Sequence, residues 1–275
     1  MEHAQVVTFW LSFLLYAAGF VYLLYFLVTK REAQNRIGLG CVIAGWLLET
    51  VTLALRWAQA GHVPVVGAYE SITTLTWAVV AVYLVLEWRT RIKALGLYVM
   101  PAVLVFLTIA WMAYSAPAAL RPALKSDIVV IHVIVIFTAV AAFVVAGGAA
   151  LIYLIEDREL KRRKIGPVLG RLPSLRTLDQ LVNHAVMFGL PFLSMGIVAG
   201  IIRAETFGVL HWWRDAVVLL AVIAWVIYAG LLYLRHASGW RGRRSAWLAL
   251  AGLVCLLAIR LVAVPYLSNF HDWGR

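Results

Sequence analysis

The stretch IVVIHVIVIFTAVAAFVVAGGAALIYL, residues 128–154, decides the fold. It contains no Asp, Glu, Lys or Arg, and its one histidine is His132. A transmembrane α-helix needs about 20 consecutive apolar residues, and this stretch is longer than that. Helices are expected in lipid because backbone N–H and C=O groups cannot stay unpaired in hydrocarbon. The stretch therefore predicts a membrane-spanning helix over Ile128–Leu154.

The rest of the chain is similarly apolar. Of its 275 residues, 64% are hydrophobic and 13% are charged, and the mean hydropathy is +0.90. A soluble domain is roughly 45–50% apolar and about 25% charged, so this composition excludes soluble globular and disordered proteins. The apolar runs do not alternate between polar and apolar residues, which disfavours a β-barrel.

Eight apolar runs, separated by charged or Gly/Pro-containing breaks, are candidate spans. They are Val6–Val28, Ile37–Leu55, Ser71–Leu86, Leu95–Ala113, Ile128–Leu154, Leu181–Ile202, Ala216–Leu234 and Ala246–Tyr266. We therefore expect an all-α integral membrane protein with eight transmembrane helices, folded as a single domain over residues 1–275.

The cations indicate how these helices are oriented. The net charge is +11, and most of the 24 Lys and Arg residues fall in alternate loops, which cover residues 30–36, 89–93, 158–176 and 235–244. Cytoplasmic loops carry an excess of Lys and Arg, so we expect these loops inside and both termini outside. The basic excess then sets the topology and indicates no nucleic-acid partner. The basic segment 155–180 would contact anionic headgroups of the lipid bilayer or, alternatively, a partner protein.

Two histidines fall at the outer boundary of the expected membrane. His132 lies about one turn into its span, and His271 lies just beyond the last span. An ionisable residue within a span is costly and indicates a functional site. Two imidazoles at the same depth could supply both axial ligands of a haem iron. The simpler alternatives are a hydrogen bond from His132 to a neighbouring helix and an ordinary polar tail around His271.

The outer loop 203–215 carries a cluster of aromatic and charged residues. Trp212 and Trp213 could form a flat apolar platform, and Arg203 or Arg214 could pair with carboxylates such as haem propionates. Tryptophan is also enriched at membrane interfaces because its ring is amphipathic, which is the simpler explanation of the pair.

Three further features concern single helices. Glu70 begins a helix after an irregular loop, where the helix dipole favours a carboxylate. Glu49 lies near Arg56 on one helix face, which indicates either an intramembrane ion pair or the polar wall of a ligand pocket. Gly196 and Gly200 form a G-x-x-x-G pattern, which indicates close helix packing.

Taken together, several segments resemble the cytochrome c assembly protein family, whose members include CcsA and CcmC, with the HemX branch closest. Residues 61–71 and Trp77 resemble the family's Gly-x-x-Pro…Glu-[Ser/Gly]…Trp pattern. Ile131-His132 resembles the helix that carries the first outer haem-ligand histidine, and Phe270-His271-Asp272-Trp273 resembles the carboxy-terminal segment that carries the second.

The resemblance implies a haem-binding protein of the bacterial cytoplasmic membrane, with haem b as the cofactor. His132 and His271 would ligate the iron. The wall of the pocket would be formed by Trp212, Trp213, Arg214 and Asp215. A HemX-like role implies that the protein senses or handles haem at the outer face and lowers the level of glutamyl-tRNA reductase, its partner.

The outer loop departs from the family's Trp-Trp-Asp motif. Trp212 and Asp215 match the motif's middle Trp and its Asp, but Arg214 stands in place of its last Trp, and residues 216–220 replace a Pro-Lys-Glu-Thr-Trp run. A haem-attachment enzyme should need these parts, so the sequence favours a HemX-like protein without lyase activity. The alternatives are a CcsA-like haem transport or attachment component with a cytochrome c maturation partner, and a membrane protein without haem.

Overall fold

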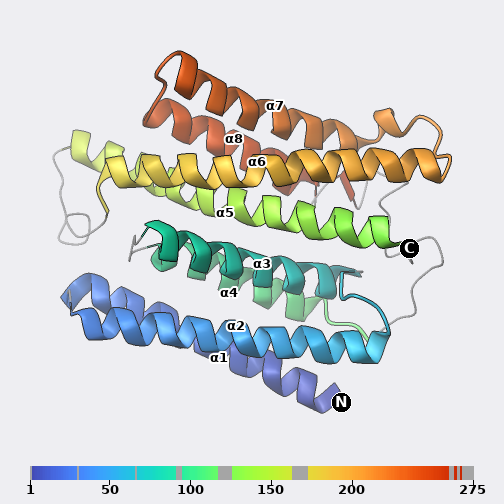
Figure 1. Cartoon of the computed structure of the whole chain (residues 1–275). Coiled ribbons are helices and arrows are strands. Elements are labelled where there is room, and N and C mark those ends of the chain that lie inside the picture. Colours follow the sequence, from blue (N-terminus) through green and yellow to red (C-terminus); the bar gives the residue numbers. More distant parts are fainter. Residues whose placement is uncertain are drawn as a thin grey trace. The chain divides into compact units, whose positions relative to one another are not determined.

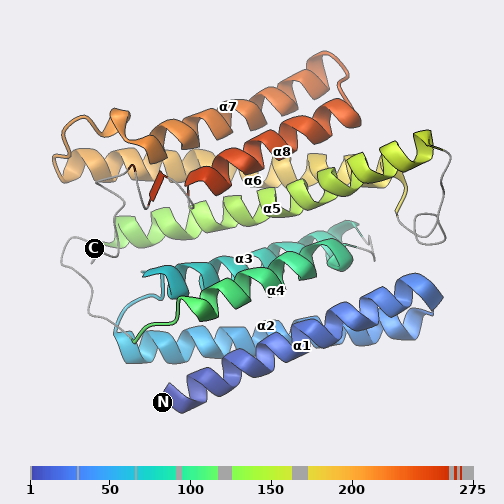
Figure 2. The same cartoon turned by 180° about the vertical axis from the view of Figure 1, so that it is seen from behind.

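The computed structural model describes residues 2–29, 31–65, 67–90, 95–116, 126–162, 173–259, 263–264 and 267. The regular elements of these residues, shown in Figures 1 and 2, are α1 Glu2–Thr29, α2 Glu32–Ala60, α3 Gly67–Thr90, α4 Gly96–Met112, α5 Asp127–Lys161, α6 Leu175–Thr206, the 3-10 helix η3 Trp212–Arg214, α7 Ala216–Ala237 and α8 Arg243–Ala258.

The chain divides into two compact units. The first comprises Met1–Arg121 and Glu159–Ser174, and the second comprises Pro122–Arg158 and Leu175–Arg275. The first unit therefore contains α1 to α4, and the second contains most of α5 together with α6 to α8. The single domain expected from the sequence stays a prediction.

Most of the expected spans lie within observed helices. Six helices are long and apolar enough to cross a membrane, namely α1, α2, α3, α5, α6 and α7. The apolar helix α4 is shorter, with 17 residues, and α8 is described as helical up to Ala258. The all-helical class is confirmed, and the six candidate spans indicate a multi-pass membrane protein. Eight spans and outer termini stay predictions.

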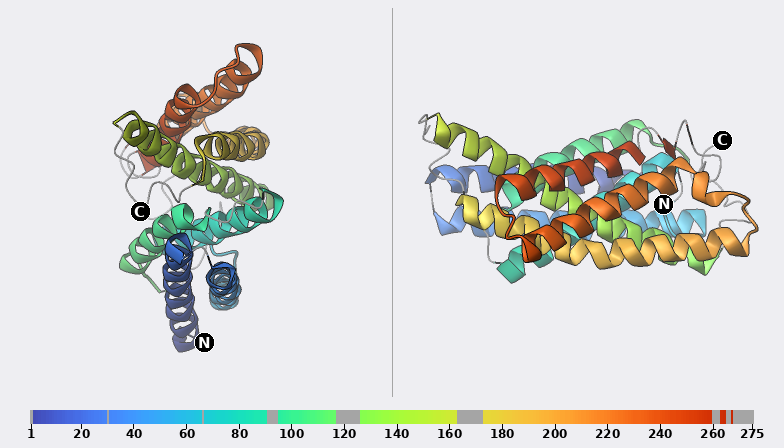
Figure 3. Two further views of the ribbon diagram at one scale, coloured as in Figure 1. Left: turned by 90° about the vertical axis from the view of Figure 1, so that its left-hand side faces the viewer. Right: turned by 90° about the horizontal axis from the view of Figure 1, so that it is seen from above.

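The helices α1 and α2 lie side by side, as the left half of Figure 3 also shows, and a buried stripe of each helix faces the other. The buried positions follow one another in alternating steps of three and four residues. The positions that follow this spacing include Gln5, Phe9, Ser12, Tyr16, Gly19 and Leu23 on α1, and Gly38, Val42, Gly45, Glu49, Thr52 and Arg56 on α2. This heptad spacing is that of a left-handed coiled coil, in which one stripe of each helix faces the other.

Small residues in this seam let the two backbones approach closely. A Cβ atom added to Gly45 would lie 2.9 Å from Tyr16 Cδ1, and one added to Gly19 would lie 3.1 Å from the Gly38 carbonyl oxygen. The Ser12 hydroxyl donates a hydrogen bond to the Gly45 carbonyl oxygen at 2.9 Å. Such contacts hold helices together in lipid, where burial of apolar surface does not drive association.

The helices α3 and α4 complete the first unit. A Cβ atom on Gly96, at the start of α4, would lie 2.7 Å from the Tyr83 hydroxyl of α3 and 2.6 Å from Leu23 Cδ1 of α1. The start of α4 therefore fits closely against both helices. Between α2 and α3, the rings of Trp46 and Trp77 stack with centroids 5.3 Å apart, and Trp46 Nε1 donates a hydrogen bond to the Trp77 carbonyl oxygen.

The second unit is built around a stacked aromatic pair. The ring centroids of Phe143 on α5 and Tyr228 on α7 lie 3.7 Å apart, with an angle of 6° between the planes. Glycines make room for both rings: a Cβ atom on Gly189 of α6 would lie 2.9 Å from Phe143, and one on Gly252 of α8 would lie 2.5 Å from Tyr228. All four helices of the unit therefore meet at this pair.

Asp179, near the start of α6, ties this helix to the connection between α7 and α8. Its Oδ1 and Oδ2 atoms accept hydrogen bonds from Arg235 Nη1 and Nη2 at 2.9 and 2.7 Å. Oδ1 also accepts one from the Gly242 N–H at 2.7 Å. Gly242 has a φ of 68°, a left-handed conformation that glycine adopts without strain. Bidentate Arg–carboxylate pairs of this kind are among the stronger polar contacts in proteins.

We expect Asp179→Asn to lower the free energy of unfolding by about 2 kcal/mol, because Arg235 loses its charged partner in a largely buried position. Arg235→Gln should cost a similar amount, and the double variant should lose less than the sum of the two. Chemical unfolding in detergent micelles measures these values.

Glu159→Gln is the matched control. Its carboxylate lies 3.9 Å from Arg162 in an exposed pair, so the expected loss is below about 0.5 kcal/mol. Equal losses at Asp179 and Glu159 would show that the buried pair contributes no more than a surface one.

Candidate functional site

His132 lies near the start of α5 and contacts α6. Its Nδ1 atom lies 2.8 Å from the carbonyl oxygen of Gly196. The hydrogen bond to a neighbouring helix, the simpler expectation for this histidine, is therefore present. A carbonyl oxygen only accepts hydrogen bonds, so Nδ1 carries the proton, and in the neutral ring Nε2 then carries the lone pair.

The G-x-x-x-G pair on α6 forms a groove that receives α5. A Cβ atom on Gly200 would lie 2.9 Å from Cε1 and 3.2 Å from Nδ1 of His132. A Cβ atom on Gly196 would collide with Ile136, which lies one turn further along α5. The absence of both Cβ atoms lets the imidazole reach the backbone of α6.

The tryptophan pair lies on η3, between α6 and α7. Trp212 is half-buried, and its Nε1 donates a hydrogen bond to Glu205 Oε1 at 2.6 Å. Trp213 is 52% exposed, and its ring lies edge-on to that of Trp212 with centroids 5.8 Å apart. His211, which precedes η3, has a φ of 59° and turns the chain there. Trp212 is thus held in place, whereas Trp213 presents its ring to the surroundings.

An apolar cavity of about 50 Å³ lies beside Trp212, between α6, η3 and α7. Its lining includes Gly200, Ala204 and Val218. Pockets for whole organic ligands hold roughly 300–1,000 Å³, so this cavity can take a substituent or an edge of a ring system and no more. Gly200 belongs to the cavity wall and also contacts His132, so the backbone of α6 separates the two.

The charged residues of the loop have local contacts as well. Asp215 precedes α7, and its Oδ1 accepts a hydrogen bond from the Val217 N–H at 2.9 Å. Arg214, the last residue of η3, is exposed. The Arg203 guanidinium lies over the Phe207 ring, 4.6 Å from its centroid. Asp215 thus has a helix-capping role, and its expected part in a binding pocket stays a prediction.

His132, the cavity and the tryptophan pair lie at the same end of the second unit, where α5 and α7 start and α6 ends, with the backbone of α6 between His132 and the cavity. His271, the expected second iron ligand, lies outside the described residues. Within the part of the chain that the structure describes, no three His, Cys, Asp or Glu side chains gather as a metal site. The ligand pair therefore stays a prediction.

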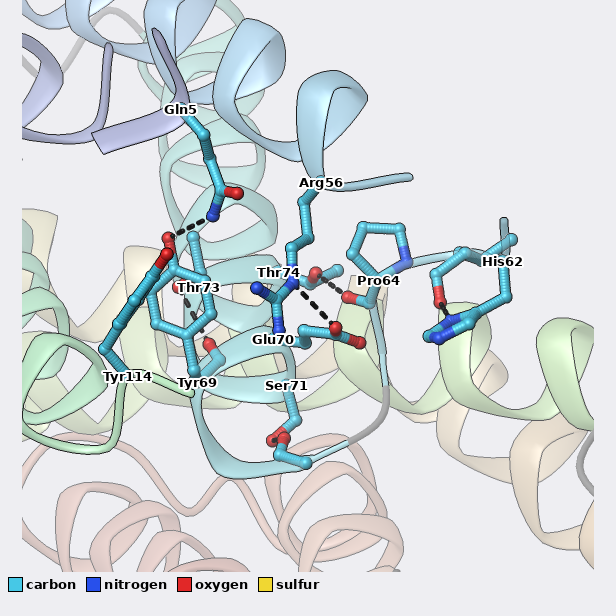
Figure 4. A network of polar contacts seen from close by, with 12 residues as sticks. Gln5, Arg56, His62, Pro64, Tyr69, Glu70, Ser71, Thr73, Thr74 and Tyr114 are labelled. Carbon is cyan, nitrogen blue, oxygen red and sulfur yellow. Dashed lines mark hydrogen bonds and ion pairs between the residues drawn. The ribbon is translucent and has the colours of Figure 1, made fainter. Parts of the chain in front are cut away.

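A second polar cluster lies in the first unit, where α2 ends and α3 begins (Figure 4). Arg56 Nε donates a hydrogen bond to Glu70 Oε1 at 2.8 Å, and both side chains are almost fully buried. The Arg56 guanidinium lies 5.3 Å from the Tyr69 ring centroid, and the Tyr69 hydroxyl accepts a hydrogen bond from Gln5 Nε2 at 3.1 Å. Three helices of the first unit are joined by this cluster.

This cluster corrects the expected partner of Arg56. The ion pair that Arg56 makes is with Glu70, whereas Glu49 Oε2 accepts a hydrogen bond from the Tyr16 hydroxyl at 2.7 Å. Arg56 and Glu49 are two turns apart on α2, about 10 Å along the axis. The start of α3 returns beside the end of α2 and brings Glu70 within reach.

Glu205 could not be predicted from the sequence as the partner of Trp212. The two residues lie on different elements, and no spacing rule connects the end of one helix with the 3-10 turn that follows it. The contacts of Tyr16 and Tyr69 could not be predicted either, because a tyrosine in an apolar run looks the same whether its hydroxyl meets lipid headgroups or a buried polar side chain.

Comparisons with known proteins agree with the resemblance. Residues 65–270 match the family model of the cytochrome C assembly protein. The cytochrome c biogenesis protein CcsA of Synechococcus sp. (strain CC9605) is 31% identical over 296 residues, which cover 94% of this chain and 94% of the relative. The protein of the same name from Parasynechococcus marenigrum (strain WH8102) is 31% identical, with 90% of each chain covered.

The CcsA protein of Guillardia theta is 28% identical over 261 residues, which cover 86% of this chain and 85% of the relative. The HemX branch stays a prediction. The match over most of the length, with the described fold, shows that the chain belongs to the cytochrome c assembly protein family.

Proposed function

We propose that the protein handles haem in cytochrome c biogenesis and binds it at the end of the second unit that carries His132 and Trp212. One observation carries this proposal: Gly200 of α6 makes room for the His132 imidazole and also lines the apolar cavity beside Trp212. A ligand atom for iron on α5 and an apolar aromatic surface on η3 thus lie on either side of one turn of α6.

The residues present fit a haem. Imidazole is a common axial ligand of haem iron, and His132 offers Nε2 for this purpose. Trp212 and Trp213 offer apolar ring faces, and the exposed Arg214 can pair with a propionate through two parallel hydrogen bonds. His271 would be the second axial ligand. Haem b, when bound, is the group that the protein would hand on for attachment to an apocytochrome.

The relatives support the CcsA-like role over haem sensing. Those from Synechococcus, Parasynechococcus and Guillardia are cytochrome c biogenesis proteins by name. We therefore put this role first, with a cytochrome c maturation protein as partner. One observation favours the HemX-like role as second candidate: Arg214, in place of the motif's last Trp, is exposed on η3. In that case the partner is glutamyl-tRNA reductase.

We also propose eight spans in the bacterial cytoplasmic membrane, with α4 and α8 as the two beyond the six candidates and with both termini outside. At the end of the second unit where α5 ends, α6 starts and α7 ends, the described cations are Arg158, Arg176, Arg235, Arg241, Arg243 and Arg244. The opposite end carries Arg203 and Arg214. An excess of cations marks the cytoplasmic side, so His132 would lie near the outer face.

The purified protein, reconstituted with haem in detergent, should show a Soret absorption band that His132→Ala abolishes and that His271→Ala weakens. His236→Ala is the matched control, because His236 is exposed near the end of α7 and its Nδ1 contacts a carbonyl oxygen of its own helix. This variant should bind haem like the wild type. A wild-type protein that takes up no haem would remove the proposal.

Expression in a bacterial strain that lacks its own CcsA-type protein separates the two candidate roles. We expect restored c-type cytochromes on haem-stained gels with the wild type and with His236→Ala, and none with His132→Ala. No restoration, together with a fall of glutamyl-tRNA reductase on immunoblots, would instead support the HemX-like role.

The topology predicts opposite accessibility of two exposed positions. In a chain with Cys41→Ser and Cys255→Ser, a membrane-impermeant maleimide should label Leu210→Cys in intact spheroplasts. It should label Ser238→Cys only after the membrane is permeabilised. The reverse pattern would place the His132 end in the cytoplasm.

A further inference from the structure

We infer that Gly196 and Gly200 are positioning residues for His132, and that together they make its Nε2 the atom that binds iron. The inference rests on the proposed haem binding and concerns how the chain prepares the ligand. Gly196 supplies the acceptor that fixes the proton on Nδ1, and Gly200 supplies the space that fixes the ring.

The first step is the hydrogen bond. The carbonyl oxygen of Gly196 lies 2.8 Å from His132 Nδ1, and it can only accept. Histidines that bind metals almost always donate their second ring N–H to a carbonyl, a carboxylate or water, which fixes the tautomer and raises the basicity of the other nitrogen. The contact seen here between α5 and α6 is of this kind.

The second step is the orientation of the ring. A Cβ atom on Gly200 would lie 2.9 Å from Cε1, 3.2 Å from Nδ1 and 3.9 Å from Nε2 of His132. Of these three atoms, Nε2 lies farthest from that position. The imidazole therefore presents its Cε1–Nδ1 edge to the groove and turns Nε2 away from Gly200. A residue larger than glycine at position 200 would push against this edge.

The third step explains why two glycines are needed. Ile136 and His132 lie one turn apart on α5, and they face Gly196 and Gly200, which lie one turn apart on α6. Because neither glycine has a side chain, α5 and α6 can lie close together along this turn. A side chain at either position would force the helices apart and lengthen the Nδ1–oxygen distance.

The test compares haem binding by Gly200→Ala with that by Gly230→Ala. Gly230 on α7 has no atom within 4 Å of an added Cβ, so it controls for a glycine-to-alanine change in a helix. We expect Gly200→Ala to weaken haem binding about 10- to 100-fold, as is typical when the hydrogen-bond partner of a metal ligand is lost. Its haem midpoint potential should also rise, because a less basic imidazole stabilises the ferric state less. Gly230→Ala should match the wild type in both values.

A second pair of variants tests whether close approach of α5 and α6, with the carbonyl of residue 196 kept as acceptor, explains the effect. Gly196→Ala should weaken haem binding, because the new methyl group collides with Ile136. Adding Ile136→Ala removes the collision and keeps the carbonyl of residue 196, so the double variant should recover most of the affinity. If the double variant stays as weak as Gly196→Ala, the hydrogen bond does not explain the effect and the inference is wrong.

A measurement without any glycine variant covers the case in which Gly200→Ala does not fold. In ferrous His271→Ala protein, His132 would be the one protein ligand, and resonance Raman spectroscopy gives the iron–imidazole stretching frequency. We expect the stretching frequency that is typical of an iron-bound imidazole whose N–H donates a hydrogen bond. The lower frequency of an imidazole without that bond overturns the inference.

The outcomes also distinguish this inference from the proposed function. If His132→Ala loses haem while Gly200→Ala keeps the wild-type affinity and potential, the positioning role is wrong and haem binding stands. If the wild type binds no haem, or His132→Ala binds it normally, both fail.

Discussion

Helices in a bilayer gain little from burying apolar side chains against one another, because lipid tails are equally apolar. The fold of this chain therefore depends on how closely its backbones can approach. Glycines stand at the decisive places in each unit: Gly45 opposite Tyr16 in the first, and Gly252 beneath Tyr228 in the second. Gly200 has the same role at the candidate site, where its missing side chain leaves space for the imidazole of His132.

Buried polar groups give this close packing its specificity. Arg56 with Glu70 and Arg235 with Asp179 each join the ends of different helices. An ionic group buried without its partner is strongly unfavourable, so each pair discriminates against arrangements in which the helix ends are displaced. The two pairs lie in separate units, and each unit thus carries its own means of fixing which helix ends meet.

Much of the fold could be predicted because long apolar runs in the sequence indicate where the membrane-spanning helices lie. The ends of the helices could not, since α6 begins at Leu175, ahead of its apolar run, where polar residues continue the helix beyond the hydrocarbon. The helix contact of His132 could be predicted because a histidine near the end of an apolar run needs a polar partner, whereas its role as an iron ligand stays a prediction. Glu205 was not, because its contact with Trp212 depends on the path of the chain after α6. The ion pair of Arg56 was assigned to Glu49 and not to Glu70. Helical periodicity identifies neighbours on the same helix, but it does not show which residue of a following helix lies alongside.

The seam between α1 and α2 has a consequence for how the chain enters the membrane during synthesis. A lone α2 would carry Glu49 into the bilayer, and a charged side chain at the centre of the bilayer costs roughly 3 kcal/mol by insertion scales. When α1 already lies beside α2, the Tyr16 hydroxyl donates a hydrogen bond to Glu49, and the Thr52 hydroxyl donates one to the Thr8 hydroxyl. The second segment is thus best released from the translocon as a hairpin with the first. The amino-terminal helix thereby acts as an insertion aid for the residues that follow it.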